Sequence, residues 1–190
     1  MTDPVQLLKE EYDALVEYLT NEQPSLVNDL NKNFRKVLLL SAGSYFESQV
    51  TSILISFVKM KSNDDLRISS FLERQAISQK YHTLFDWGKK DTPDRPGTSA
   101  SSFFKLFGDK FKSDIEGELQ QKKDDSREII EQKENISKSI TAFLEIGHLR
   151  NILVHSNFAA YNYDQKTTQE IYDLYLAAKP FLSYITEKLN

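Results

Sequence analysis

The stretch that decides the fold is "VLLLSAGSYFESQVTSILISFV", residues 37 to 58. It is apolar on nearly every side of a helix, which is typical of a helix surrounded by other helices in a bundle. Its small residues at positions 41 to 44 would let a neighbouring helix approach closely. Glu47, Gln49 and several serines make the stretch too polar for a comfortable membrane span. We therefore predict a long central helix from about Leu26 to Met60.

Helical periodicity continues on both sides of this stretch. Apolar residues recur at three- and four-residue spacing in "VQLLKEEYDALVEYL", residues 5 to 19, and in a last helix over residues 169 to 189. Pro180 lies inside the last pattern and is expected to kink or divide it. Residues 63 to 88 predict one or two further helices, and strand signals are almost absent. The sequence thus predicts an all-α bundle of about five to seven helices.

One domain over residues 1 to 190 is expected, because 190 residues with 39% hydrophobic content can form one sizeable core. The stretch "KKDTPDRPGTSASS", residues 89 to 102, contains both proline and glycine and predicts a loop inserted within that domain. Residues 116 to 134 form a run of mixed charge that favours helix. We expect this run to be a solvated helix that can project from the domain.

Composition excludes several kinds of function. The chain has no cysteine, which excludes disulfides, thiolate metal sites and a cysteine nucleophile. Its first residues lack the basic and apolar segments of a signal peptide, so we expect a cytoplasmic protein without membrane contact. A net charge of −4 and a pI near 5.5 argue against holding nucleic acid by bulk electrostatics, although a local basic site is compatible with them.

A cluster of polar residues lies in "EIGHLRNILVHSN", residues 145 to 157. His148, Asn151 and His155 recur at three- and four-residue spacing and therefore share one face of a helix. Arg150 is turned from His155 by about 140°, but its long stem can carry the guanidinium around the helix. One face is thus committed to polar groups and the opposite face to packing, by Ile146, Leu149 and Leu153.

Two interpretations of this cluster are a structural role at the end of the helix and a metal site. In the first, Arg150 and His155 are cations near the negative end of a helix, which Asn157 closes in the left-handed conformation. In the second, Glu145 and His148 form the Glu-x-x-His pair of di-iron bundles. That pair needs a second copy, and neither His82 nor His155 is preceded by a glutamate at the matching position. We therefore expect no metal and no cofactor.

A third interpretation is phosphodiester cleavage. Cutting RNA without a metal requires a base for the 2′-hydroxyl, an acid for the leaving 5′-oxygen and a cation for the charged phosphorane. Histidine serves as base or acid near neutral pH, and arginine offers a fixed fork to phosphate oxygens. His155 and Arg150 supply these groups, and Asn151 could hold the phosphate or the imidazole. A second histidine would complete the set.

The segment "RNILVHSN" resembles the R-x4-6-H signature of the HEPN superfamily, the higher eukaryotes and prokaryotes nucleotide-binding domains. Arg150, Asn151 and His155 occupy the places of arginine, polar residue and histidine in that signature. The resemblance extends to most of the chain. It includes an all-α bundle, a long apolar helix with an acid at its centre, here Glu47, and a motif near the end of a late helix that one more helix follows.

This resemblance implies a metal-independent RNA endonuclease that cleaves by 2′-hydroxyl attack in a homodimer. The bacterial proteins that the chain resembles are associated with defence and toxin–antitoxin loci, so we expect such a context here. A twofold axis would bring a second His155 and a second Arg150 to one phosphate. Arg150 would stabilise the phosphorane and His155 would transfer protons, while Asn151 and Glu47 would position them. The implied partners are an RNA substrate, a second copy of the chain, and a cognate antitoxin or defence-system protein.

Alternatives remain at each level. Glu47 is equally compatible with a surface carboxylate or with an ion pair to Arg35 or Lys36. A non-catalytic interaction module or scaffold is the alternative function, motivated by the charged run at 116 to 134. Several aromatic residues could stack on bases, but their helical spacing favours a place in the core; they are Trp87, Phe103, Phe104, Phe107 and Phe111.

Overall fold

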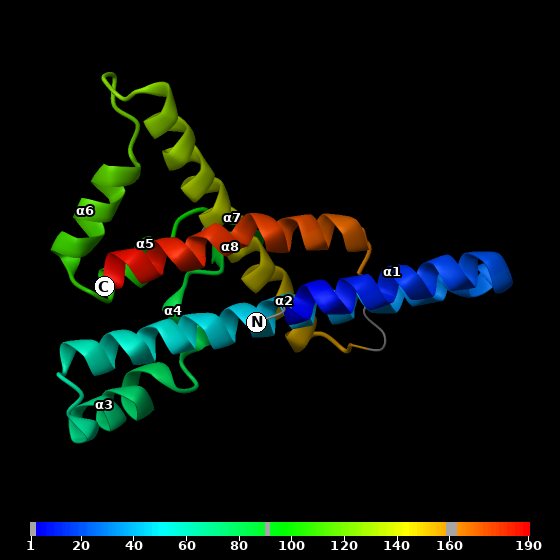
Figure 1. The fold of residues 1–190 in the computed structure, drawn as a ribbon, viewed down its shortest axis with the longest axis horizontal. Coiled ribbons are helices and arrows are strands. Elements are labelled where there is room, and N and C mark those ends of the chain that lie inside the picture. Colours follow the sequence, from blue (N-terminus) through cyan, green and yellow to red (C-terminus); the bar gives the residue numbers. More distant parts are fainter. Residues whose placement is uncertain (1–2, 90–91, 159–162) are drawn as a thin grey trace.

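The computed structural model describes residues 3–89, 92–158 and 163–190, and it confirms the all-α fold class (Figure 1). Within these residues there are eight α-helices, of which α3, α4 and α5 have seven residues or fewer. A 3₁₀ turn at Pro24–Leu26 precedes α2, and a π-helical turn at Glu73–Ile77 follows α3. The helices are α1 (Pro4–Glu22), α2 (Val27–Lys61), α3 (Leu66–Leu72), α4 (Tyr81–Leu84), α5 (Ser101–Lys105), α6 (Asp109–Leu119), α7 (Arg127–His155) and α8 (Thr168–Leu189).

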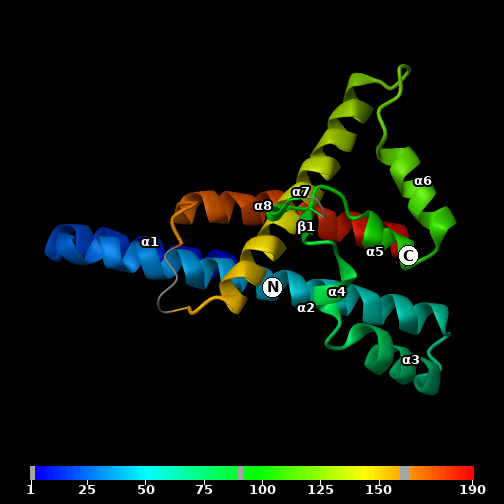
Figure 2. The ribbon, with the colours of Figure 1, turned by 180° about the vertical axis from the view of Figure 1, so that it is seen from behind.

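Helix α2 is the predicted long central helix, and it runs for 35 residues. Leu38, Leu39 and Val50 are fully buried on it, as expected for a helix covered by neighbours. Helix α1 folds back along the first half of α2, α8 packs along its middle, and α7 crosses between them (Figure 1 and Figure 2). No helix among the described residues is both long and apolar enough to cross a membrane.

The core is built around aromatic rings from α2, α7 and α8. The ring of Phe143 on α7 lies 5.3 Å from that of Phe46 on α2 and 4.9 Å from that of Phe181 on α8, both in edge-to-face contact. Trp87, Phe103 and Phe104 are buried in the same cluster, while Phe107 and Phe111 pack against it. The aromatic residues of the 87 to 111 region therefore belong to the core or pack against it.

The charged run at 116 to 134 does not form the single helix that we predicted. Helix α6 ends at Leu119 and α7 begins at Arg127, with Ser126 accepting a hydrogen bond from the backbone N–H of Ile129 as N-cap. Lys133 bridges the loop by an ion pair of 2.7 Å to Asp125. Aspartate and serine compete with helical backbone bonds, which explains the interruption. Helix α6 and the first turns of α7 form a V that projects from the molecule (Figure 1).

The predicted loop at 89 to 102 and the predicted effect of Pro180 also differ from the structure. The predicted loop at 89 to 102 contributes to a short antiparallel hairpin of β1 (Gly88–Lys89) and β2 (Thr92–Pro96), although residues 90 and 91 lie outside the described residues. Helix α8 is not divided at Pro180, since it runs without interruption from Thr168 to Leu189. Its start is fixed by a capping box between Thr167 and Glu170.

Asp3 joins the N-terminus of α1 to α8. Its carboxylate accepts hydrogen bonds from the backbone N–H groups of Val5 and Gln6, from the Tyr175 hydroxyl and from the Lys179 ammonium, the last at 2.8 Å. Burial raises the pKa of Asp3, but these hydrogen bonds outweigh it, so the pKa is below its ordinary value. A carboxylate with a lowered pKa stabilises the fold above its unfolded-state pKa, and this contribution is lost as pH falls through the folded-state pKa.

We predict that Asp3→Asn lowers the free energy of unfolding at pH 7 by about 2 kcal/mol, because a neutral amide replaces a carboxylate that accepts charge-assisted hydrogen bonds. The difference from the unaltered protein should narrow as pH falls below about 4, where the unfolded-state carboxyl protonates. Urea unfolding at a series of pH values measures both effects. Asp124→Asn, in the exposed loop before α7, is the matched control and should change little at either pH. An Asp3→Asn difference that stays constant down to pH 3 would contradict the ionic origin of the effect.

Candidate functional site

A glycine on α2 lets the polar end of α7 lie directly against it. A Cβ atom at Gly43 would lie 2.8 Å from Cγ and 3.2 Å from Cβ of Arg150, closer than side chains normally pack. Both views show the last turns of α7 beside α2 (Figure 1 and Figure 2). Ala42 is fully buried beside this contact, whereas Ser44 is exposed. The expected close helix approach at residues 41 to 44 is therefore confirmed at Ala42 and Gly43.

The guanidinium of Arg150 is held by two oxygen atoms. Nη2 donates to Oε2 of Glu47 at 3.1 Å, and Nη1 donates to Oδ1 of Asn151 at 3.3 Å. The side chains of Arg150 and Glu47 are 24% and 40% exposed, so the pair is reachable from solvent. Glu47 therefore forms its ion pair with Arg150, as the family resemblance implied, and not with Arg35 or Lys36. A guanidinium has five N–H donors, and an incoming anion can use those that the two oxygens leave.

Tyr81 on α4 is a neighbour of this pair that sequence reasoning missed. Burial raises the pKa of its hydroxyl above the ordinary value, the Glu47 carboxylate raises it further, and the Arg150 guanidinium acts in the opposite direction. The hydroxyl therefore stays protonated at neutral pH. The Tyr81 ring is buried, and its centre lies 5.3 Å from the centre of the Trp87 ring. Nothing in the sequence near Tyr81 marks it, because only the tertiary fold brings α4 to α2 and α7.

His155 is the last residue of α7 and is exposed. Hydrogen bonds join Glu47, Arg150 and Asn151, whereas no hydrogen bond or ion pair joins His155 to another described residue. The helix ends because Ser156 is extended, with φ −95° and ψ 159°. The expected left-handed closure at Asn157 is wrong, since the non-glycine residues with positive φ in the described ranges are Asn63, Asp64 and Gln79.

The residues of the Glu-x-x-His interpretation have other partners. His148 is 6% exposed, and its Nε2 lies 3.3 Å from the backbone carbonyl oxygen of Asp94 in β2. The Glu145 carboxylate forms an ion pair of 2.8 Å with Lys166. Within the described part of the chain, no three histidine, aspartate or glutamate side chains converge as a metal-binding group. His148 thus has a structural role between α7 and the hairpin.

A second contact from α2 holds the chain just after the motif. Lys36 is 4% exposed, its Nζ donates to the backbone carbonyl oxygen of Phe158 at 2.8 Å, and the same atom lies 4.7 Å from the centre of the Phe158 ring. Lys36, Gly43 and Glu47 share one face of α2, being separated by seven and four residues. Helix α2 therefore fixes the chain on both sides of His155. Sequence reasoning missed this contact, for which the only signal is the aromatic residue directly after "RNILVHSN".

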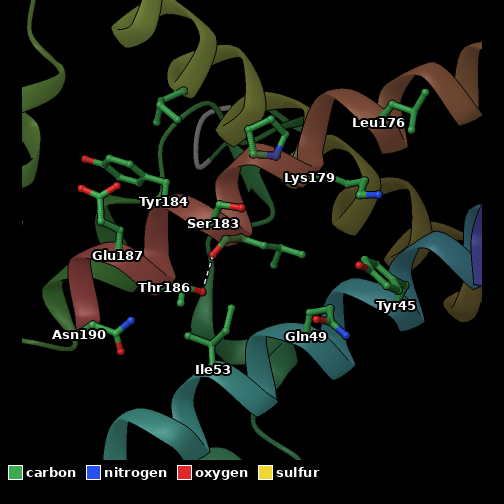
Figure 3. Close-up of a pocket in the computed structure, with 13 residues that line it drawn as sticks. Tyr45, Gln49, Ile53, Leu176, Lys179, Ser183, Tyr184, Thr186, Glu187 and Asn190 are labelled. Atoms are coloured by element: carbon green, nitrogen blue, oxygen red, sulfur yellow. Dashed lines mark hydrogen bonds between the residues drawn. The ribbon is translucent and has the colours of Figure 1, made fainter. Parts of the chain in front are cut away.

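A further hollow of the molecule lies elsewhere. It is a groove of about 1040 Å³ between α2 and α8, lined among others by Tyr45, Gln49 and Ser183 (Figure 3). Tyr45 and Gln49 are turned by roughly 200° around α2 from Gly43 and Glu47. The groove therefore opens on the side of α2 opposite to Arg150. The polar site is instead a surface formed by the end of α7 and the face of α2 beside it.

Comparison with known families identifies the family of this chain. The family model described as RiboL-PSP-HEPN matches residues 7–190, a range that includes Glu47, Arg150, Asn151 and His155. Neither the curated proteins nor the solved structures include a match to this chain. The match covers nearly the whole bundle, and it confirms the predicted membership of the HEPN superfamily. The chain belongs to the RiboL-PSP-HEPN family of the HEPN superfamily.

Proposed function

We propose that this protein is a metal-independent RNA endonuclease whose active site forms where the α7 ends of two subunits meet. The single observation that carries the proposal is that the end of one helix presents both a partly exposed guanidinium, oriented by its hydrogen bonds, and an exposed imidazole. Arg150 is fixed by Glu47 and Asn151, so it loses little freedom when it binds a phosphate. His155 is on the same helix, five residues after Arg150, and is exposed to solvent.

The reaction follows from these groups. One His155 takes the proton of the 2′-hydroxyl as its oxygen attacks phosphorus, and a bond between that oxygen and phosphorus forms. The bond to the 5′-oxygen breaks, and the leaving oxygen receives a proton from the partner's His155. Arg150 stabilises the extra negative charge of the pentacoordinate phosphorus. The products are a 2′,3′-cyclic phosphate and a 5′-hydroxyl end.

Two subunits are needed because the attacking and leaving oxygens lie on opposite sides of the phosphorus. Arg150 and His155 of one chain are separated by about 7.5 Å along the helix and about 140° around it. The signature contains one histidine, His155, so one chain supplies one imidazole to the reaction. A twofold axis near the α7 ends supplies the second. Val154 beside His155 and Val37 on α2 are 50% and 39% exposed, and such apolar side chains favour burial against a second copy.

Cleavage of RNA in EDTA tests this proposal. Pure protein should cut mixed RNAs in EDTA, and the new ends should carry the cyclic phosphate and the 5′-hydroxyl. His155→Ala should not cut, whereas His82→Ala should, because His82 is an exposed histidine on α4 that is not part of the HEPN signature. Equal cleavage by the unaltered protein and His155→Ala, or cleavage of no RNA by either, would remove the proposal.

A bacterial defence or toxin–antitoxin context follows from such an activity, because unrestrained RNA cleavage harms the cell that makes it. A cognate antitoxin or defence-system protein would then be the regulating partner. Expression in bacteria should arrest growth, and Arg150→Ala or His155→Ala should relieve the arrest. Growth arrest that persists with both variants would contradict this context.

A non-catalytic interaction module is the second candidate. Three large apolar side chains of α3 favour it: Leu66, Ile68 and Phe71 are 76%, 50% and 63% exposed. The V of α6 and α7 offers a further charged surface. A stoichiometric partner from the native host that is lost when residues 116 to 134 are altered, together with a harmless Arg150→Ala in cells, would favour this function over cleavage.

A further inference from the structure

Phe158 is an exposed aromatic residue three positions after His155. The residue is 41% exposed, and of the chain's 12 phenylalanines, all within the described residues, the only other exposed one is Phe71 on α3. The remaining ten lie in or against the core. Phe158 is thus exposed where most phenylalanines of this molecule are packed, and it lies three residues after His155 in the chain. This position suggests a role at the site.

The ring is held in place from below by a buried cation. Burying the Lys36 ammonium is unfavourable unless it has partners, and here it has the Phe158 carbonyl oxygen at 2.8 Å and the Phe158 ring at 4.7 Å. Lys36 lies over one face of the Phe158 ring, and the residue is nonetheless 41% exposed, so the ring keeps surface that a stacking partner can use. Fixing the ring in advance reduces the entropy that a stacking partner must overcome.

The position of the ring suits a strand of RNA that crosses the site. Three residues span at most about 10 Å, so the ring lies within about one or two nucleotides of a phosphate bound at His155. Base stacking on an aromatic ring tolerates any sequence but requires an unpaired base that can leave its own stack. Resting on the proposed function, we propose that Phe158 stacks on a base beside the scissile phosphate and directs the enzyme to single-stranded or looped RNA.

Affinity for a labelled single-stranded RNA oligonucleotide tests this inference without cleavage. It is measured in the His155→Ala protein, with and without a change at residue 158. Phe158→Ala should weaken binding about tenfold, and Phe158→Trp should retain it, since stacking needs a ring. Phe158→Leu, which keeps apolar bulk but no ring, should behave like Phe158→Ala. Phe71→Ala, the matched loss of an exposed phenylalanine on α3, should bind as tightly as the parent.

A duplex of the same sequence should bind weakly and equally to all these variants. Equal affinity of Phe158→Ala and its parent for the single strand would overturn the inference while leaving the proposed cleavage intact, provided that the unaltered protein cuts RNA. A protein that cuts no RNA removes both. If Phe158→Ala instead turns a dimer into a monomer by light scattering, the ring is a subunit contact and the stacking role is wrong.

Discussion

Replacing Arg150 or His155 with alanine is expected to lower kcat for RNA cleavage by about a thousandfold, with a smaller change in KM. Each side chain acts chiefly on the transition state, since Arg150 stabilises charge that develops on phosphorus and His155 moves protons that are in transfer. Steady-state cleavage of one RNA measures both constants. The matched controls are Arg67→Ala, whose side chain is 94% exposed on α3, and His82→Ala on α4. A rise in KM with unchanged kcat would reassign both residues to binding.

A composite site also predicts how mixed dimers behave. If both His155 side chains serve one phosphate, a dimer with one His155→Ala subunit is inactive. Equal amounts of the unaltered protein and His155→Ala are mixed and allowed to exchange subunits. The mixture should cut at about a quarter of the rate of the same total concentration of unaltered protein, because only that share of dimers carries two intact subunits. Retention of half the rate after proven exchange would show that each subunit works alone. A monomer at micromolar concentration would exclude the shared site.

Replacing Gly147 with alanine is expected to destabilise the fold by about 3 kcal/mol. A Cβ atom at Gly147 would lie 2.0 Å from Cζ3 and 2.1 Å from Cε3 of Trp87, which is far inside contact distance. Trp87 cannot move away easily, because its ring is buried and its Nε1–H donates to the backbone carbonyl oxygen of His82 at 2.9 Å. Overpacking of a filled core forces backbone shifts of this cost. Urea unfolding measures the loss.

Gly117 in α6 provides the matched control with the opposite sign. No atom lies within 4 Å of a Cβ placed there, so alanine fits without strain. Alanine inside a helix is more favourable than glycine, and Gly117→Ala should stabilise the protein by about 0.5 to 1 kcal/mol. A Gly147→Ala variant as stable as the parent would show that β1 and the Trp87 ring can move away from α7 at little cost.

The sequence predicted the fold class well because its evidence is local. The apolar run at 37 to 58 can be buried on all sides only in the middle of other helices, and this requirement does not depend on which helices those are. The motif at Arg150 and His155 was likewise readable from spacing within one helix. The break of the charged run at 120 to 126 was missed, because mixed charge favours helix on average while three residues, Asp124 to Ser126, favour a cap.

The sequence by itself determined a long buried helix, a polar motif at the end of a late helix, and the identity of the groups available there. Only the tertiary structure decided their partners: Glu47 meets Arg150 across 103 residues, and Lys36 meets Phe158 across 122. Helical periodicity tells which face of a helix is polar or apolar, but it carries no information about which distant face will cover it. Which faces meet depends on the packing of whole helices. Here Gly43 contributes to it, because its missing side chain lets α7 lie against α2.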